Sequence, residues 1–106
     1  MVKNGMRPVH PGEILLEDFM RGSDRPINAN ALAKALAVPA NRITAIIKGQ
    51  RGITGDTAVR LAAFFSTTAE FWMNLQKTYE LRLAEQAFPD KVKRHIEQNR
   101  KALVAI

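Results

Sequence analysis

The 106-residue sequence contains no cysteine, and it has no apolar run long enough to span a bilayer. The first absence excludes disulfide bonds and thiolate metal sites. The second excludes a transmembrane helix, which needs about 20 consecutive apolar residues. The N-terminus also lacks the basic and apolar pattern of a secretory signal peptide. We therefore expect a cytoplasmic protein that does not contact a membrane.

Acidic residues are missing from one long stretch of the chain. Residues 25–55 contain no Asp or Glu, although they contain Arg25, Lys34, Arg42, Lys48 and Arg51. The whole chain has a net charge of +6 and a sequence pI near 10.2. A surface of one sign attracts the phosphates of nucleic acid and gives salt-dependent binding. The alternative is an ordinary solvated basic face, but this charge coincides with a helical motif.

That motif covers residues 28–49, NANALAKALAVPANRITAIIKG, where two short helical patterns are joined by Val38 and Pro39. In the second pattern Ile43, Ile46 and Ile47 recur at i, i+3 and i+4, so they share one buried face. The opposite face carries an amide, a hydroxyl, a methyl and an ammonium group, from Asn41, Thr44, Ala45 and Lys48. These groups can contact base edges and phosphates. The pattern predicts the recognition helix of a helix-turn-helix.

The residues at the ends of the two helices agree with this interpretation. Asn28 is a favourable N-cap for the first helix. Pro39 cannot continue that helix but suits the first turn of the next one. Ala33 is small enough to let the two helices cross closely, and Gly49 is a natural left-handed helix end.

The run ALAKALAVPANRITAIIKG resembles the helix-turn-helix of the phage repressor and Cro superfamily, with small and apolar residues at its key positions, Ala33, Val38, Ile43 and Ile46. It departs from that pattern at Ala37, where the superfamily usually has a glycine with positive φ. An alanine in this conformation is strained by roughly 1–2 kcal/mol. If Ala37 avoids it, the angle between the helices differs instead.

The resemblance extends beyond the motif. HPGEILLEDFM before it, with GQRGITGDTAVRLAAFF and EFWMNLQKTYELRLAE after it, is similar to the HigA family of bacterial antitoxins over about residues 7–85. This resemblance implies an all-α fold, a five-helix lambda-repressor-like domain. It also implies a repressor of its own operon that neutralises a HigB-type toxin, usually a messenger-RNA nuclease. A repressor of the same fold without a toxin, from a phage or a metabolic system, remains the alternative.

The pattern divides the chain into three parts. We expect an N-terminal arm at residues 1–9, the DNA-binding domain at 10–85 and a C-terminal extension at 86–106 that can form a helix. Within the domain, Thr54 is expected to cap the fourth helix, and Thr67 with Glu70 to form a capping box for the fifth. The extension could pack on a partner subunit, touch DNA, bind a toxin or be partly disordered.

The predicted DNA-binding residues follow from their positions on the motif. Asn41 can bond an adenine edge in two places, and Ala45 or the Thr44 methyl can touch a thymine methyl. Basic side chains near the helix are suited to phosphates, as are the first-turn amides at Asn28. A small residue at Ala40 allows close approach. The full predicted set is Asn28, Pro39, Ala40, Asn41, Arg42, Thr44, Ala45, Lys48 and Arg51.

One recognition helix reads only a few base pairs. Affinity typical of specific repressors therefore implies a two-fold homodimer on a palindromic operator in double-stranded DNA, with half-sites about one helical turn apart. The fifth helix and the segment that follows it are the expected dimer surface, because Trp72, Leu75, Tyr79 and Leu83 offer more apolar area than one small core needs. Alternatively, the last segment folds back and covers these residues.

Metal and catalytic sites have little support in the sequence. His10, Glu13 and Glu17 could share a helical face and hold a metal, but such a set is more typical of a capped helix start with solvated acids. His10 and His95 could act as acid and base in a nuclease, but nothing brings them together. No GxSxG, HExxH or P-loop motif is present. The sequence therefore predicts no catalytic site, no metal site and no cofactor.

Overall fold

The computed structural model describes residues 7–104, and these residues form helices and no strand. The first six residues of the predicted arm, and residues 105–106 of the extension, lie outside the described part. The helices are α1 (Pro11–Ile14), which continues directly into the π-helical segment η1 (Leu15–Met20), then α2 (Ala29–Leu36), α3 (Ala40–Ile47), α4 (Gly55–Phe65), α5 (Ala69–Ala87) and α6 (Asp90–Leu103). None of the described helices is long and apolar enough to cross a membrane.

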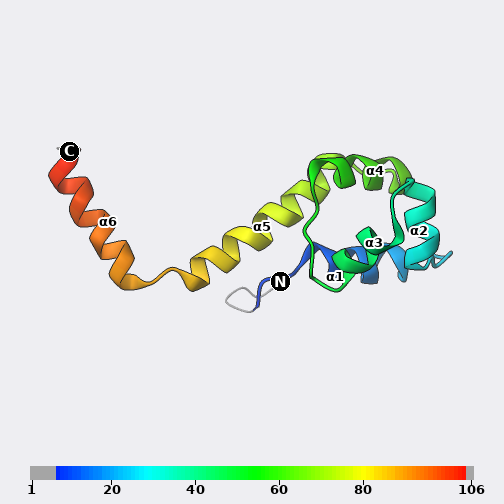
Figure 1. Cartoon of the computed structure of the whole chain (residues 1–106), viewed down its shortest axis with the longest axis horizontal. Coiled ribbons are helices and arrows are strands. Elements are labelled where there is room, and N and C mark those ends of the chain that lie inside the picture. The colour runs from blue at the N-terminus through cyan, green and yellow to red at the C-terminus, as the bar shows by residue number, and fades with distance from the viewer. Residues whose placement is uncertain (1–6, 105–106) are drawn as a thin grey trace.

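Figure 1 shows α1 to α4 gathered into a body. Helix α5 begins at one edge of this body and runs outward from it, with α6 at the far tip. The molecule is accordingly long, with principal extents of 57 × 26 × 22 Å. The predicted boundary after residue 85 falls near the end of α5, because Pro89 stops that helix. Within the extension, residues 90–103 form α6.

The core collects one apolar row from each helix of the body. Seven of its side chains are completely buried: Leu15, Leu32, Ile43, Ile46, Ala58, Leu61 and Trp72. The Phe19 ring packs beside this core, with its centroid 4.8 Å from that of Trp72 and 5.2 Å from that of Phe65. The aromatic residues of the first, fourth and fifth helices therefore serve packing.

Side-chain caps begin α2, α4 and α5. Asn28 and Thr54 cap as predicted, accepting hydrogen bonds from the backbone N–H groups of residues 31 and 57. The predicted capping box of the fifth helix is wrong by one residue. Thr68 is the cap, at 3.0 Å from the Phe71 nitrogen. The Thr67 hydroxyl instead accepts a 2.8 Å bond from the Trp72 indole, which satisfies the N–H of a buried ring.

The first helix differs from expectation in its second half, where the backbone widens into η1. The Arg21 N–H donates to the Leu16 carbonyl, five residues back, at 2.9 Å. Before this point, Gly12 brings α1 against the end of α3. A Cβ added at Gly12 would lie 1.9 Å from the Ile46 carbonyl oxygen. This close approach fixes the position of α3 relative to α1.

Candidate nucleic-acid interface

The turn between α2 and α3 depends on the unusual backbone of Ala37. Its φ of 59° and ψ of 46° place it in the left-handed region. This resolves the alternative left by the sequence, and it implies strain of roughly 1–2 kcal/mol. The Val38 N–H then donates to the Ala33 carbonyl at 3.0 Å and closes the turn. The two helices thus adopt the crossing of a helix-turn-helix despite the missing glycine.

The faces of α3 divide as predicted, with one difference. Ile43 and Ile46 are completely buried, whereas Ile47 is only partly buried. Asn41 and Lys48 are exposed on the other side. Gly49 ends the helix with φ 75°, as expected. The buried isoleucines therefore hold the polar face of α3 toward solvent, where DNA could reach it.

The first turn of α3 is open to solvent. Pro39 and Ala40 are both exposed, and no side chain caps this helix end. The Thr44 hydroxyl donates back to the Ala40 carbonyl at 3.2 Å, so its proton is already used. Thr44 and Ala45 are partly buried. These groups offer small contacts at the helix surface and allow a close approach of the backbone.

The start of α2 is only partly available to an anion. The Asn28 side chain accepts the Ala31 N–H at 2.8 Å, so the cap itself uses one of the first-turn donors. The preceding N–H groups of the first turn remain as donors for a phosphate oxygen.

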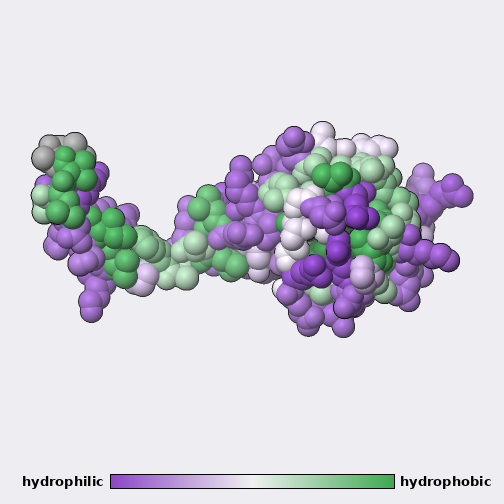
Figure 2. Space-filling model, turned by 45° about the horizontal axis from the view of Figure 1, so that its top comes forward, coloured by the Kyte–Doolittle hydropathy of each residue, from purple (hydrophilic) through white to green (hydrophobic). Residues whose placement is uncertain are grey.

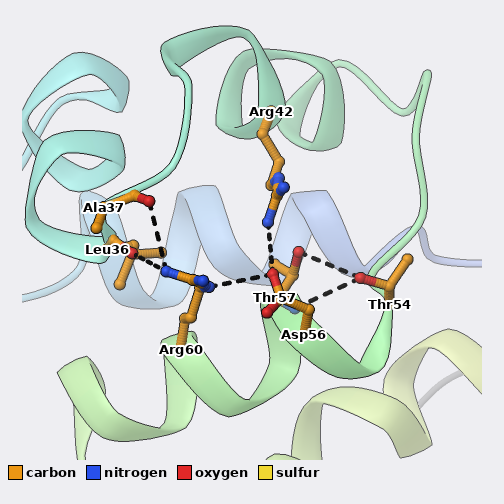
Figure 3. A network of polar contacts seen from close by, with 7 residues as sticks. All are labelled: Leu36, Ala37, Arg42, Thr54, Asp56, Thr57 and Arg60. Atoms are coloured by element: carbon orange, nitrogen blue, oxygen red, sulfur yellow. Dashed lines mark hydrogen bonds and ion pairs between the residues drawn. The ribbon is translucent and has the colours of Figure 1, made fainter.

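The structure gives Arg42, a predicted phosphate contact, a partner within the protein. Its guanidinium points to α4, where Nη1 lies 2.7 Å from Asp56 Oδ2, and its side chain is only 22% exposed (Figure 3). The hydrogen bond from Arg42, with a second from Arg60, holds the pKa of Asp56 below its usual value. Asp56 lies just after residues 25–55, the stretch without acidic residues. A charge count over that stretch therefore did not include the partner of Arg42. Arg42 therefore ties the recognition helix to α4.

Arg60 was not found by sequence reasoning, although it completes the same network. Its Nη1 donates to the Leu36 carbonyl at 2.7 Å and approaches the Ala37 carbonyl at 3.4 Å (Figure 3). Its Nε donates to Asp56 at 3.1 Å. The i,i+4 spacing of Asp56 and Arg60 is a visible signal for their pair, but not for the contact with the turn. Arg60 satisfies carbonyls that end α2.

A second buried polar contact fixes the loop after α3. Gln76 of α5 is 7% exposed, and its Oε1 accepts the Ile53 N–H at 2.8 Å. Its Nε2 donates to Glu80 at 2.7 Å. Arg51 lies in this loop and is exposed. Gln76 was also missed, because nothing in the spacing of α5 marks a partner 23 residues earlier.

His10 links the same loop to the start of α1. Its Nδ1 accepts the Gly12 N–H at 2.9 Å, and its side chain also bonds the backbone of Arg51. Burial lowers the pKa of His10, while Glu13 and the Arg51 backbone act in the opposite direction. His10 is thus a structural cap. No cluster of three His, Cys, Asp or Glu side chains able to hold a metal occurs among residues 7–104.

The four residues of the expected dimer surface differ in exposure. Trp72 is completely buried in the core, so it has no side-chain area to offer a partner. Leu75 and Tyr79 are partly buried, and Tyr79 packs its ring against His10 with centroids 4.8 Å apart. Leu83 is 42% exposed. The apolar side of α5 therefore serves the core at its start and faces solvent at its end.

Comparisons with known proteins give a consistent result, although no protein-family profile matches the chain. The virulence-associated protein I of Dichelobacter nodosus is 49% identical over 84 residues, which are 79% of this chain and 76% of that protein. The antitoxin HigA-1 of Vibrio cholerae is 33% identical over 93 residues, 88% of this chain and 86% of that protein.

Two solved structures share the fold. An addiction module antidote protein of the HigA family from Coxiella burnetii has 52% sequence identity and a TM-score of 0.72, covering 88% of this chain and 95% of that one. The Pseudomonas aeruginosa antitoxin HigA, solved with the higBA promoter, has 45% identity and a TM-score of 0.77, covering 83% of this chain and 94% of that one.

Proposed function

This chain belongs to the HigA family of antitoxins, and we propose that it represses its own operon by binding a palindromic operator as a homodimer. The observation that carries this proposal is the orientation of α3, whose buried Ile43 and Ile46 leave Asn41 and Lys48 on the outside. An eight-residue helix with this outer face can enter the major groove. The Pseudomonas relative was solved with its promoter, which supports the same role here.

The α1–η1 helix and α2 to α5 act as the five-helix lambda-repressor-like DNA-binding unit. Phosphates are bound by Lys48 and Arg51 at the end of α3, and by the amides at the start of α2, with Arg25 and Lys34 adding exposed positive charge. Arg42 has no part in this set. The protein works in the cytoplasm, where its operator lies.

A selection of double-stranded duplexes by the purified chain tests this function. We expect enrichment of an inverted repeat whose half-sites are about one helical turn apart, ~34 Å. Such a result reports sequence preference and dimer spacing together. A pool that stays random after repeated rounds would reject a specific repressor.

The second part of the function is neutralisation of a HigB-type toxin encoded beside the chain, as its family membership supports. Co-expression of the full chain with the product of the adjacent gene, followed by purification through a tag on one of the two, tests this directly. A stable complex is expected. A clean failure to associate would leave the chain as a repressor of the same fold without a toxin.

A further inference from the structure

Helix α6 carries a narrow apolar row that faces solvent. Val92 is 40% exposed, Ile96 51% and Leu103 81%, and every described residue of the helix is exposed. With Asn99 the row has spacings of 4, 3 and 4, which is the repeat of a helix that packs against another helix. Figure 2 shows apolar residues gathered along this tip of the molecule beside hydrophilic ones.

A helix of this kind needs a partner surface. It has 14 residues, five of them basic and two acidic, and no side chain caps its start. Helices of this length are marginal in water even when their sequence is favourable. The apolar row is therefore the feature that can stabilise α6, once it is covered.

We propose that α6 packs on α5 of a second copy of this chain, and that the two copies exchange this helix reciprocally. This rests on the homodimer of the proposed function and specifies its contact. A two-fold arrangement makes each copy both donor and acceptor of α6.

Helix α6 is exposed along its described length and does not pack on its own α5 in the structure, and the connection between the two helices is extended. Phe88 has φ −78° and ψ 112°, and Pro89 has φ −71° and ψ 138°, so both residues are extended. Proline fixes its own φ and keeps the residue before it out of the helical region. The two-residue connection therefore carries the chain away from α5, as Figure 1 shows.

The acceptor surface is a shallow groove on α5. Its lining includes Met73, Lys77, Glu80 and Leu81, of which Met73 is 38% and Leu81 50% exposed. This groove offers exposed apolar side chains to the apolar row of α6, with charged groups at its rim.

Charge favours α5 as the acceptor. Helix α5 has three acidic and two basic side chains, whereas α6 is basic. In each copy, Lys93 and Arg100 flank the apolar row of α6. If α6 paired with the α6 of a second copy, these basic side chains would come together and repel one another. Packing on α5 instead brings the basic helix next to a helix with more acidic than basic side chains, one of which, Glu80, lines the groove.

Two variants of α6 test the proposal, one with a new negative charge in the apolar row and one with the same charge outside it. Ile96→Asp places a carboxylate in the apolar row, and Gln98→Asp places the same group outside it. We expect Ile96→Asp to raise the dimer dissociation constant of the full chain about tenfold or more in sedimentation equilibrium, and Gln98→Asp to leave it unchanged within about twofold. Equal dimerisation of both variants and wild type would overturn the proposal. Because α6 is exposed, neither change disturbs the core.

Cross-linking identifies the acceptor, since the chain has no cysteine of its own. Chains with Met73→Cys are mixed with differently tagged chains carrying Ile96→Cys and treated with a short thiol cross-linker. A product that contains both tags supports the exchange. A product formed only between Ile96→Cys chains would overturn it. A cross-link within one chain, in a dilute solution of the variant that carries both Met73→Cys and Ile96→Cys, would also overturn it.

Failure of this inference is separable from failure of the proposed function. A wild-type chain that dimerises and selects an inverted repeat, while Ile96→Asp does both equally well, removes the role of α6 and leaves the repressor in place. A chain that selects no repeat removes the repressor itself, whatever the cross-links show.

Discussion

Arg42 of the recognition helix is bound to Asp56 of α4, with 2.7 Å between the guanidinium nitrogen and the carboxylate oxygen. Asp56 also accepts from Arg60, which in turn donates to the Leu36 carbonyl at the end of α2. The Asp56–Arg60 pair of α4 thus bonds both helices of the helix-turn-helix, α3 through Asp56 and α2 through Arg60. The charge that remains at the exposed end of α3 is that of Lys48 and Arg51.

The ion pair between Arg42 and Asp56 predicts that DNA binding by an Arg42 variant and by a Lys48 variant depends differently on salt. Lys48→Ala should weaken binding to all duplexes and lower the slope of log affinity against log salt by about 0.9, the value of one phosphate contact. Arg42→Ala should leave the slope unchanged, because its guanidinium is turned to Asp56. Binding titrations at several salt concentrations measure both slopes. A loss of one contact in Arg42→Ala would show that the ion pair opens on DNA.

The sequence was sufficient for elements whose signal is local. The isoleucine spacing gave the faces of α3, and the caps Asn28 and Thr54 gave two helix starts. It was insufficient where a side chain chooses between partners far along the chain. Arg42 on a polar face could face phosphate or α4, and the choice depends on Asp56, 14 residues later, coming within reach. Trp72 similarly shares one helical side with Leu83, but only the fold shows which is buried.

The left-handed Ala37 predicts a stabilising substitution. Glycine tolerates φ 59° without strain, so Ala37→Gly relieves strain in the folded state, although glycine also gives the unfolded chain more conformational entropy. The net effect should be a rise of about 1 kcal/mol in the free energy of unfolding. Ala35→Gly, two residues earlier within α2, is the control and should lower it by about 1 kcal/mol. Denaturant titrations measure both. Destabilisation by both substitutions would contradict the strain at Ala37.

The buried amide of Gln76 predicts a cost when it is replaced by a side chain of similar size. Gln76→Met leaves the Ile53 N–H without its acceptor, and an unsatisfied buried donor costs about 1–3 kcal/mol. Glu80→Gln alters the exposed partner and should change the free energy of unfolding by less than about 0.5 kcal/mol. Equal effects in a thermal or denaturant titration would mean that the Ile53 N–H finds another acceptor.

His10 predicts a dependence of stability on pH. Burial lowers its pKa from the ordinary 6.5, so the folded state favours the neutral ring, whose Nδ1 accepts the Gly12 N–H. Stability is therefore fully present above pH 6.5 and falls as the pH drops through 6.5 toward the folded-state pKa.

The matched variant for this effect is His10→Asn, since asparagine keeps an acceptor for the cap but does not titrate. Denaturant titrations between about pH 7.5 and 5 should show a smaller loss of stability on acidification than in wild type. His95→Asn, on exposed α6, should retain the wild-type dependence. An unchanged slope in His10→Asn would assign the effect to other groups.

Asn41 is the residue most suited to read a base, because its amide is exposed in the first turn of α3 and can both donate and accept. Asn41→Ala should therefore reduce the preference for the selected operator over a duplex changed at one base pair by about 1–3 kcal/mol, while binding to random duplex stays the same. Lys48→Ala supplies the contrast, since a phosphate contact is lost equally on both duplexes. Competition titrations with the operator and its single-base variants separate the two. If Asn41→Ala weakened all duplexes equally, Asn41 would hold the backbone, and specificity would have to come from the methyl groups of Thr44 and Ala45 or from the shape of the DNA.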